Sequence, residues 1–131
     1  NSSARLVLCQ PRLCHVTPLL LELHWLPACS RIEFKLLLIT FKVLKGLAPL
    51  YLGQLISVLP PSSYNISRNF NGTLLCSPTF KSKGTLGDRA FSSAASALWN
   101  SLPLAINNVD QPIESFKKKI KAHLFTRVFA D

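Results

Sequence analysis

The sequence predicts a small, mainly all-α protein made of several short helices. Apolar residues fill 48% of the 131 positions, which is enough for a packed core. These residues recur at spacings of three and four along most of the chain, which is the pattern of helices that bury one face. Nine prolines keep the segments short. At most one short β-hairpin is expected, around residues 73–83.

The first fifty residues contain three predicted helices. Residues 4–9 indicate the end of one helix, before Pro11. Thr17 offers a capping hydroxyl for a second, short helix that Pro27 ends. Ser30 and Glu33 form a capping-box pattern, which predicts a third helix over 31–45. This third helix should be buried on most of its circumference, and Gly46 sits where a left-handed helix end is expected.

The second half of the chain begins after a short helix opened by Pro49, whose predicted buried side is Leu50, Leu52, Leu55 and Ile56. Residues 59–73 are rich in Pro, Ser, Asn and Gly and indicate a loop. Asp88 can cap a helix that Pro103 ends. The last predicted helix is amphipathic, with an apolar stripe of Ile113, Phe116, Ile120 and Leu124.

These elements predict three parts. An N-terminal helical unit covers 1–58, a loop or linker with the possible hairpin covers 59–84, and a C-terminal helical unit covers 85–131 and packs on the first.

The charge is unusually positive, because 15 Lys and Arg face only six Asp and Glu. A net charge of +9 favours phosphate backbones as partners, with anionic membrane surfaces second. Four basic residues fall within roughly 80° on the third predicted helix, and four more crowd the last one. The predicted nucleic-acid-binding residues are Arg31, Lys35, Lys42, Lys45, Lys117, Lys118, Lys119 and Lys121. The alternative is that they are only the solvated faces of two helices.

Aromatic residues allow a further contact with nucleic acid. Trp25, Trp99 and Tyr51 can stack on unpaired bases. The competing interpretation is that the two tryptophans, which lie close to prolines, are core anchors.

The sequence predicts no catalytic residue and no cofactor. It contains no phosphate-binding loop, no nucleophile elbow and no cluster of carboxylates. A zinc site built on Cys9, Cys14, His24 and Cys29 stays open as an alternative, although its ligand spacing is loose. The best apolar run is interrupted by lysines, so no membrane span is expected. Of the two classes of anionic partner, nucleic acid is predicted and a membrane is not. A cytoplasmic or nuclear location is therefore predicted, and the absence of an initial methionine indicates a fragment of a longer protein.

Several strings along the chain carry a family resemblance. They are Leu23-His24-Trp25-Leu26-Pro27, Arg31-Ile32-Glu33-Phe34-Lys35, Gly46-Leu47-Ala48-Pro49, Gly87-Asp88-Arg89-Ala90-Phe91 and Leu98-Trp99-Asn100-Ser101-Leu102-Pro103, with Ser115-Phe116-Lys117 and His123-Leu124-Phe125 at the end. In this order the chain resembles the C-terminal region of the polyprotein of LINE-class non-LTR retrotransposons, downstream of the reverse transcriptase core.

That resemblance implies a parent that is an RNA-directed DNA polymerase, whose metal-binding aspartates have no counterpart in this chain. It implies a non-catalytic helical extension that touches RNA or DNA, or that packs on the rest of the polyprotein. Two alternatives stay open at this point: a purely structural packing module, and a decayed copy with no ligand of its own.

Overall fold

The computed structural model describes residues 2–60, 72–78 and 90–130. Within these ranges the protein is mainly helical, as the sequence predicts. Its helices are α1 (Ser2–Val7), α2 (Val16–Glu22), α3 (Ala28–Leu44), α4 (Leu50–Gly53), α5 (Phe91–Asn100) and α6 (Ile113–Phe129). None of these helices combines the length and the apolar character that crossing a bilayer requires.

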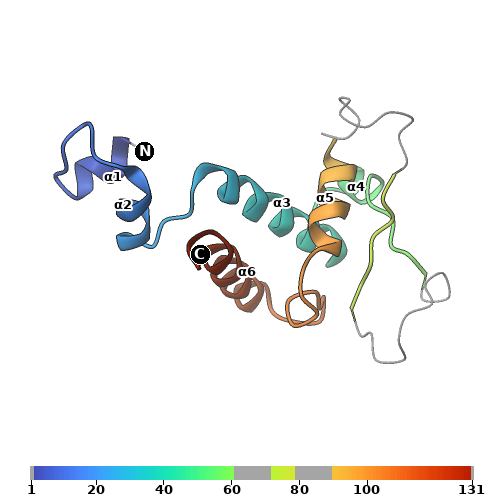
Figure 1. The fold of residues 1–131 in the computed structure, drawn as a ribbon. Coiled ribbons are helices and arrows are strands. Elements are labelled where there is room, and N and C mark those ends of the chain that lie inside the picture. Colours follow the sequence, from blue (N-terminus) through green and yellow to red (C-terminus); the bar gives the residue numbers. More distant parts are fainter. Residues whose placement is uncertain (1, 61–71, 79–89, 131) are drawn as a thin grey trace.

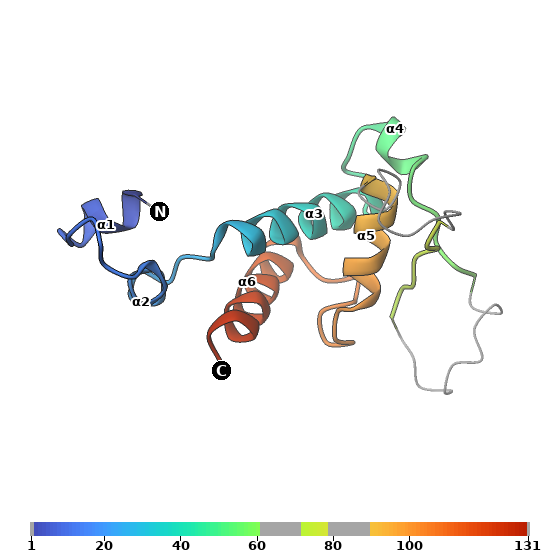
Figure 2. The same cartoon turned by 45° about the horizontal axis from the view of Figure 1, so that its top comes forward.

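Helix α3 is the centre of the molecule. Figures 1 and 2 show α5 crossing its C-terminal half, while α6 lies beside it and α1 and α2 lie beyond its N-terminal end. The main core forms where α3, α5 and α6 meet, and it also takes in Leu75 from an extended segment. At its centre the rings of Phe41 and Phe116 stack with their centroids 4.0 Å apart, and Trp99 lies 5.7 Å from Phe116. All three aromatic side chains are fully buried.

A smaller core joins α1 and α2. It consists of Ala4, Leu19 and Leu20, and Phe129 from the end of α6 packs against it. The last turn of α6 therefore connects the N-terminal helices to the rest of the protein.

Left-handed residues end three of the helices. After α3, Gly46 has φ +70°, as its position in the sequence predicts. Gly46 NH donates a hydrogen bond to Val43 O, and Leu47 NH donates one to Lys42 O. The same pair of bonds follows α1 and α2, where the left-handed residues are Cys9 (φ 51°) and His24 (φ 53°). This conformation is strained for both side chains, by about 1 kcal/mol each.

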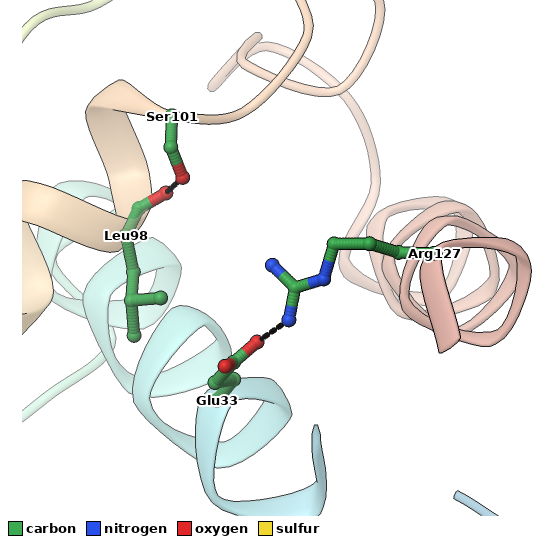
Figure 3. Close-up of polar contacts among 4 residues, drawn as sticks. All are labelled: Glu33, Leu98, Ser101 and Arg127. Carbon is green, nitrogen blue, oxygen red and sulfur yellow. Dashed lines mark hydrogen bonds and ion pairs between the residues drawn. The ribbon is translucent and has the colours of Figure 1, made fainter. Parts of the chain in front are cut away.

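Two of the predicted N-terminal helix caps, Ser30 and Thr17, are wrong. Helix α3 begins at Ala28 after Pro27, so Ser30 lies inside the first turn, where it is buried and caps nothing. The carboxylate of Glu33 does not return to the backbone but accepts a hydrogen bond from the guanidinium of Arg127 on α6 (Figure 3). Thr17 lies within α2, which begins at Val16 and has no side-chain cap. Asp88 lies outside the described residues, and Ala90 precedes α5 as an extended residue.

The predicted burial of α4 is only partly right. Ile56 belongs to the main core, but Leu50 and Leu55 are 83% and 50% exposed. The apolar spacing after Pro49 is helical, but in the described part of the chain no element covers that side of α4. In α6, by contrast, Phe116, Ile120 and Leu124 are all buried, which confirms the predicted stripe.

Residues 73–76 are extended, but their partner is not the one that the predicted hairpin requires. This segment runs antiparallel to residues 57–59, with an isolated bridge between Val58 and Leu75. The expected partner at 79–83 lies outside the described residues.

Side chains of α5 hold the extended segment in place. The side-chain amide of Asn100 makes two hydrogen bonds with the backbone of Leu75. Its Oδ1 accepts one from Leu75 NH and its Nδ2 donates one to Leu75 O, each at 2.9 Å. Trp99 Nε1 donates to Thr73 O at 2.8 Å. Two residues of the Leu-Trp-Asn-Ser-Leu-Pro string therefore satisfy backbone groups that a neighbouring strand would satisfy in a sheet.

Candidate nucleic-acid interface

The eight predicted binding residues all lie on α3, α6 or the end of α3, and all are exposed or half-buried. They do not form one continuous stripe. Their surroundings divide them into side chains that are engaged by the protein itself and side chains that face solvent, and this division decides which of them are available to a ligand.

Three of the predicted lysines are engaged by other groups of the protein. Lys117 Nζ donates to Glu114 Oε1 at 2.7 Å, and this hydrogen bond, followed by the charge of Lys117, lowers the pKa of Glu114. Lys119 Nζ donates to Gln111 Oε1 at 2.8 Å. Lys45 Nζ lies 5.7 Å from the centroid of the Phe41 ring. Each of these three ammonium groups therefore has a partner within the protein.

The two predicted groups of basic residues meet at one place. Arg31 and Lys35 from α3 and Lys121 from α6 line the same pocket, which has a volume of about 680 Å³. Arg31 and Lys35 are one helical turn apart, so their side chains point to the same side of α3. Within the described ranges none of the three makes an ion pair or a hydrogen bond with another side chain, and all three are exposed.

The other predicted residues extend this surface. Lys118 is exposed and precedes Lys121 by three residues, so it lies on the same side of α6. Lys42 is half-buried and follows Lys35 by two helical turns, about 10 Å along α3. Arg31, Lys35 and Lys121 line the pocket and Lys118 lies outside it, and all four are exposed; we call these four cations the basic pocket group.

Apolar and aromatic side chains complete the pocket. Leu20, Leu26 and Phe34 line it beside the cations, and so do His24 and Trp25 from the connection between α2 and α3. His24 is held by a parallel stack on Phe125 of α6, with the ring centroids 5.4 Å apart and the planes 6° apart. Trp25 is 40% exposed.

The left-handed turn at His24 explains this position of Trp25. The turn reverses the chain after α2, and Trp25 NH donates to Leu20 O at 2.9 Å. Leu26, the next residue, is buried in the main core and anchors the other end of the connection. The Leu-His-Trp-Leu-Pro string therefore places one exposed indole between two anchored neighbours. Sequence reasoning identified Trp25 as a possible stacking residue but gave no signal for the contact of His24 with α6.

The other two aromatic candidates have different places. Trp99 is fully buried in the main core, so its interpretation as a core anchor is right and base stacking is excluded. Tyr51 is 64% exposed on α4, away from the residues that line the pocket.

The charged side chains that line the pocket are all positive. The described carboxylates are those of Glu22, Glu33, Asp110 and Glu114, and none of them lines the pocket; Glu33 is paired with Arg127 and Glu114 with Lys117. A cavity with three cationic side chains and no described carboxylate in its wall attracts anions, since field lines concentrate in concave sites.

The alternative zinc site does not form. No group of three or more His, Cys, Asp or Glu side chains close enough to share a metal ion exists among the residues that the structure describes. Cys9, Cys14, His24 and Cys29 all lie within these ranges, so the sequence pattern does not correspond to one site. None of the cysteines is in a disulfide.

Comparison with known proteins identifies no relative: no family model, no curated protein and no solved structure matches the chain.

Proposed function

We propose that this chain is a non-catalytic module that binds the phosphate backbone of RNA or DNA without sequence specificity. The observation that carries the proposal is the meeting of Arg31, Lys35 and Lys121 at one pocket that no described carboxylate lines. Cations that are already paired with protein carboxylates gain little from a phosphate, whereas unpaired cations release condensed counterions when they bind one. The basic pocket group supplies such cations from two helices.

The family resemblance supports the same proposal. By that resemblance, the chain would be a C-terminal extension that touches template RNA or target DNA, or packs on the rest of its parent, in the cytoplasm or the nucleus. In that setting a sequence-independent grip on phosphates is useful without any catalytic group in the chain itself. We propose this context as the origin of the module.

Salt dependence tests the proposal directly. Binding of the 131-residue chain to a fluorescent 20-nucleotide single strand is measured by anisotropy between 50 and 300 mM salt. Three contacted phosphates predict a slope of log K against log [salt] of about −2 or steeper. A triple variant, Arg31→Gln with Lys35→Gln and Lys121→Gln, should make the slope shallower by about 2. Lack of binding by the wild-type chain at 50 mM salt would contradict the proposal.

A second candidate function is that of a packing module with no ligand. It is favoured by the exposed apolar side chains around α4, where Leu47, Leu50 and Tyr51 are each more than 60% exposed. This candidate predicts that the isolated chain self-associates and binds an apolar dye strongly, and that Leu47→Ser with Leu50→Ser reduces both effects. It also predicts that nucleic acid changes neither effect.

A further inference from the structure

We infer that the pocket between α2, α3 and α6 receives one unpaired nucleotide, with its base against Trp25 and its phosphate among Arg31, Lys35 and Lys121. This inference rests on the proposed function and deepens it, because it makes the chain a single-strand binder. Backbone binding alone would not favour single strands over duplexes, because a duplex carries the higher charge density.

The shape of the pocket favours a nucleotide over a bare phosphate. Its volume of about 680 Å³ lies in the range of sites for small organic ligands, roughly 300–1,000 Å³. A phosphate needs only the cationic side of the pocket. The rest of the lining comes from Ser3 and Ala4 of α1, Leu20, Leu26 and Phe34, and the rings of His24 and Trp25. This part of the lining is mostly apolar, so it offers little to a phosphate but can receive the flat, weakly polar face of a base.

Trp25 is the residue that converts the apolar wall into a stacking platform. Indole rings bind bases of any identity through their π faces. Trp25 is 40% exposed although Leu26 beside it is 93% buried, so the chain leaves a large aromatic surface in contact with solvent at the edge of the pocket. Stacking on a base would cover this surface, because the planar ring of a base can lie parallel to the indole.

The surroundings of Trp25 are preorganised for such a contact. His24 is held against Phe125, and Trp25 NH is bonded to Leu20 O, so the backbone that carries the indole is fixed on both sides. Arg31 follows Trp25 by six residues and reaches the same cavity from the first turns of α3. Aromatic and cationic side chains line one pocket, so they can contact the base and the phosphate of the same nucleotide.

A duplex cannot use this site, because its bases are stacked and paired and cannot enter a side pocket without unpairing. We therefore expect a preference for single strands that depends on Trp25. An anionic lipid surface would engage the same cations, but a headgroup has no ring to stack on the indole.

The experiment compares three probes of equal length: a 20-nucleotide thymidine strand, the same backbone with abasic sites throughout, and a 20-base-pair duplex. Each is titrated against the 131-residue chain at one salt concentration. We expect the thymidine strand to bind about 5- to 100-fold more tightly than the abasic strand, and Trp25→Ala to reduce its affinity to the abasic level. Binding of the abasic strand should not change in Trp25→Ala.

Tyr51→Ala is the matched control, because it removes another exposed aromatic side chain that lies away from the pocket. Its affinities should equal those of the wild type. Since Trp99 is buried in the core, the change in tryptophan fluorescence on binding should come from Trp25 and should disappear in Trp25→Ala.

The outcomes distinguish a failure of the single-nucleotide pocket from a failure of the proposed phosphate binding. Equal affinity for the thymidine and abasic strands overturns the single-nucleotide pocket and leaves the proposed function standing. Absence of binding to all three probes overturns both. A fluorescence change with phosphatidylserine vesicles, but with no oligonucleotide, also overturns both and assigns the cations to a lipid surface.

Discussion

The carboxylate of Glu33 on α3 accepts a hydrogen bond from the guanidinium of Arg127, near the end of α6 (Figure 3). The pair joins two helices that are far apart in the sequence, next to the region where the N-terminal helices attach. It also neutralises one of the few carboxylates of the chain. Both side chains keep partial contact with solvent, at 28% and 46% exposure.

Because this pair is partly solvated, we expect its contribution to be modest. Glu33→Gln should lower the free energy of unfolding by about 0.5 kcal/mol, measured by urea denaturation. The combined variant Glu33→Gln with Arg127→Gln should cost no more than the sum of the two single changes, and the loss should shrink in 1 M salt. A loss that is unchanged in 1 M salt would argue against an ionic contribution.

Asn100 should matter far more for stability than its exposed neighbour Ser101. Asn100→Asp removes the donor to Leu75 O and places a negative charge beside that carbonyl, so we expect a loss of about 2 kcal/mol. Ser101→Ala removes only an exposed hydrogen bond to Leu98 O (Figure 3) and should change stability by less than about 0.5 kcal/mol. Thermal unfolding compares the two variants. Similar melting temperatures would contradict a stabilising role for the hydrogen bonds between Asn100 and Leu75.

The left-handed conformation of His24 predicts an unusual order of two substitutions. His24→Ala loses the stack on Phe125 and keeps the strained backbone, whereas His24→Gly loses the same stack and relieves the strain. The glycine variant should therefore be the more stable of the two by about 1 kcal/mol. Urea denaturation measures this difference, and an alanine variant that is more stable than the glycine variant would contradict the left-handed turn.

The titration of Glu114 should depend on Lys117. The hydrogen bond from Lys117, and then its charge, lower the pKa of Glu114 below the ordinary value of 4.5. A lowered pKa in the folded protein means that the contact stabilises above the ordinary pKa and is lost as the pH falls through the lowered value. Lys117→Ala should return the pKa of Glu114 towards 4.5 in an NMR pH titration. Lys118→Ala is the control and should move it less, because Lys118 acts on Glu114 only through a weaker Coulomb interaction.

Lysines that are two positions apart on α6 should contribute differently to nucleic-acid binding. Lys121 lines the pocket, while Lys119 lies about 200° around the helix and donates to Gln111. Lys121→Ala should reduce the salt slope of single-strand binding by about 1, and Lys119→Ala should change it much less. Equal effects of the two changes would indicate a diffuse charge effect rather than a pocket.

The helical class and the end of α3 could be predicted because their signals are local. Position 46 holds glycine, the residue type that adopts a left-handed helix end without strain. The apolar residues of α6 are spaced so that they share one face, which the protein buries. The ends at Cys9 and His24 could not be predicted, because neither residue type requires a positive φ as a glycine at a helix end indicates one. The stack of His24 on Phe125 is a contact between distant parts of the chain, so local sequence does not reveal it either.

Contacts between helices that are distant in the sequence explain why the predicted cap of α3 was wrong and the predicted buried side of α4 only partly right. The capping box of Ser30 and Glu33 is a local pattern, but Arg127 offers Glu33 a charged partner that is not visible in a short window of sequence. Leu50 and Leu55 have helical spacing, yet spacing alone does not say which face of α4 meets another element. The two basic groups were each recognisable on their own helix. Their convergence at Trp25 depends on how α3 and α6 pack, which the sequence does not state.

The centre of the core has a consequence for the synthesis of the chain. Phe41 leaves the ribosome long before Phe116, its stacking partner, and Trp99 also precedes the helix that covers it. We therefore expect nascent chains that stop before Ile113 to expose the core-facing sides of α3 and α5, and to be recognised by chaperones and proteases. On this expectation, products that lack the final helix would be removed from the cell faster than the full 131-residue chain.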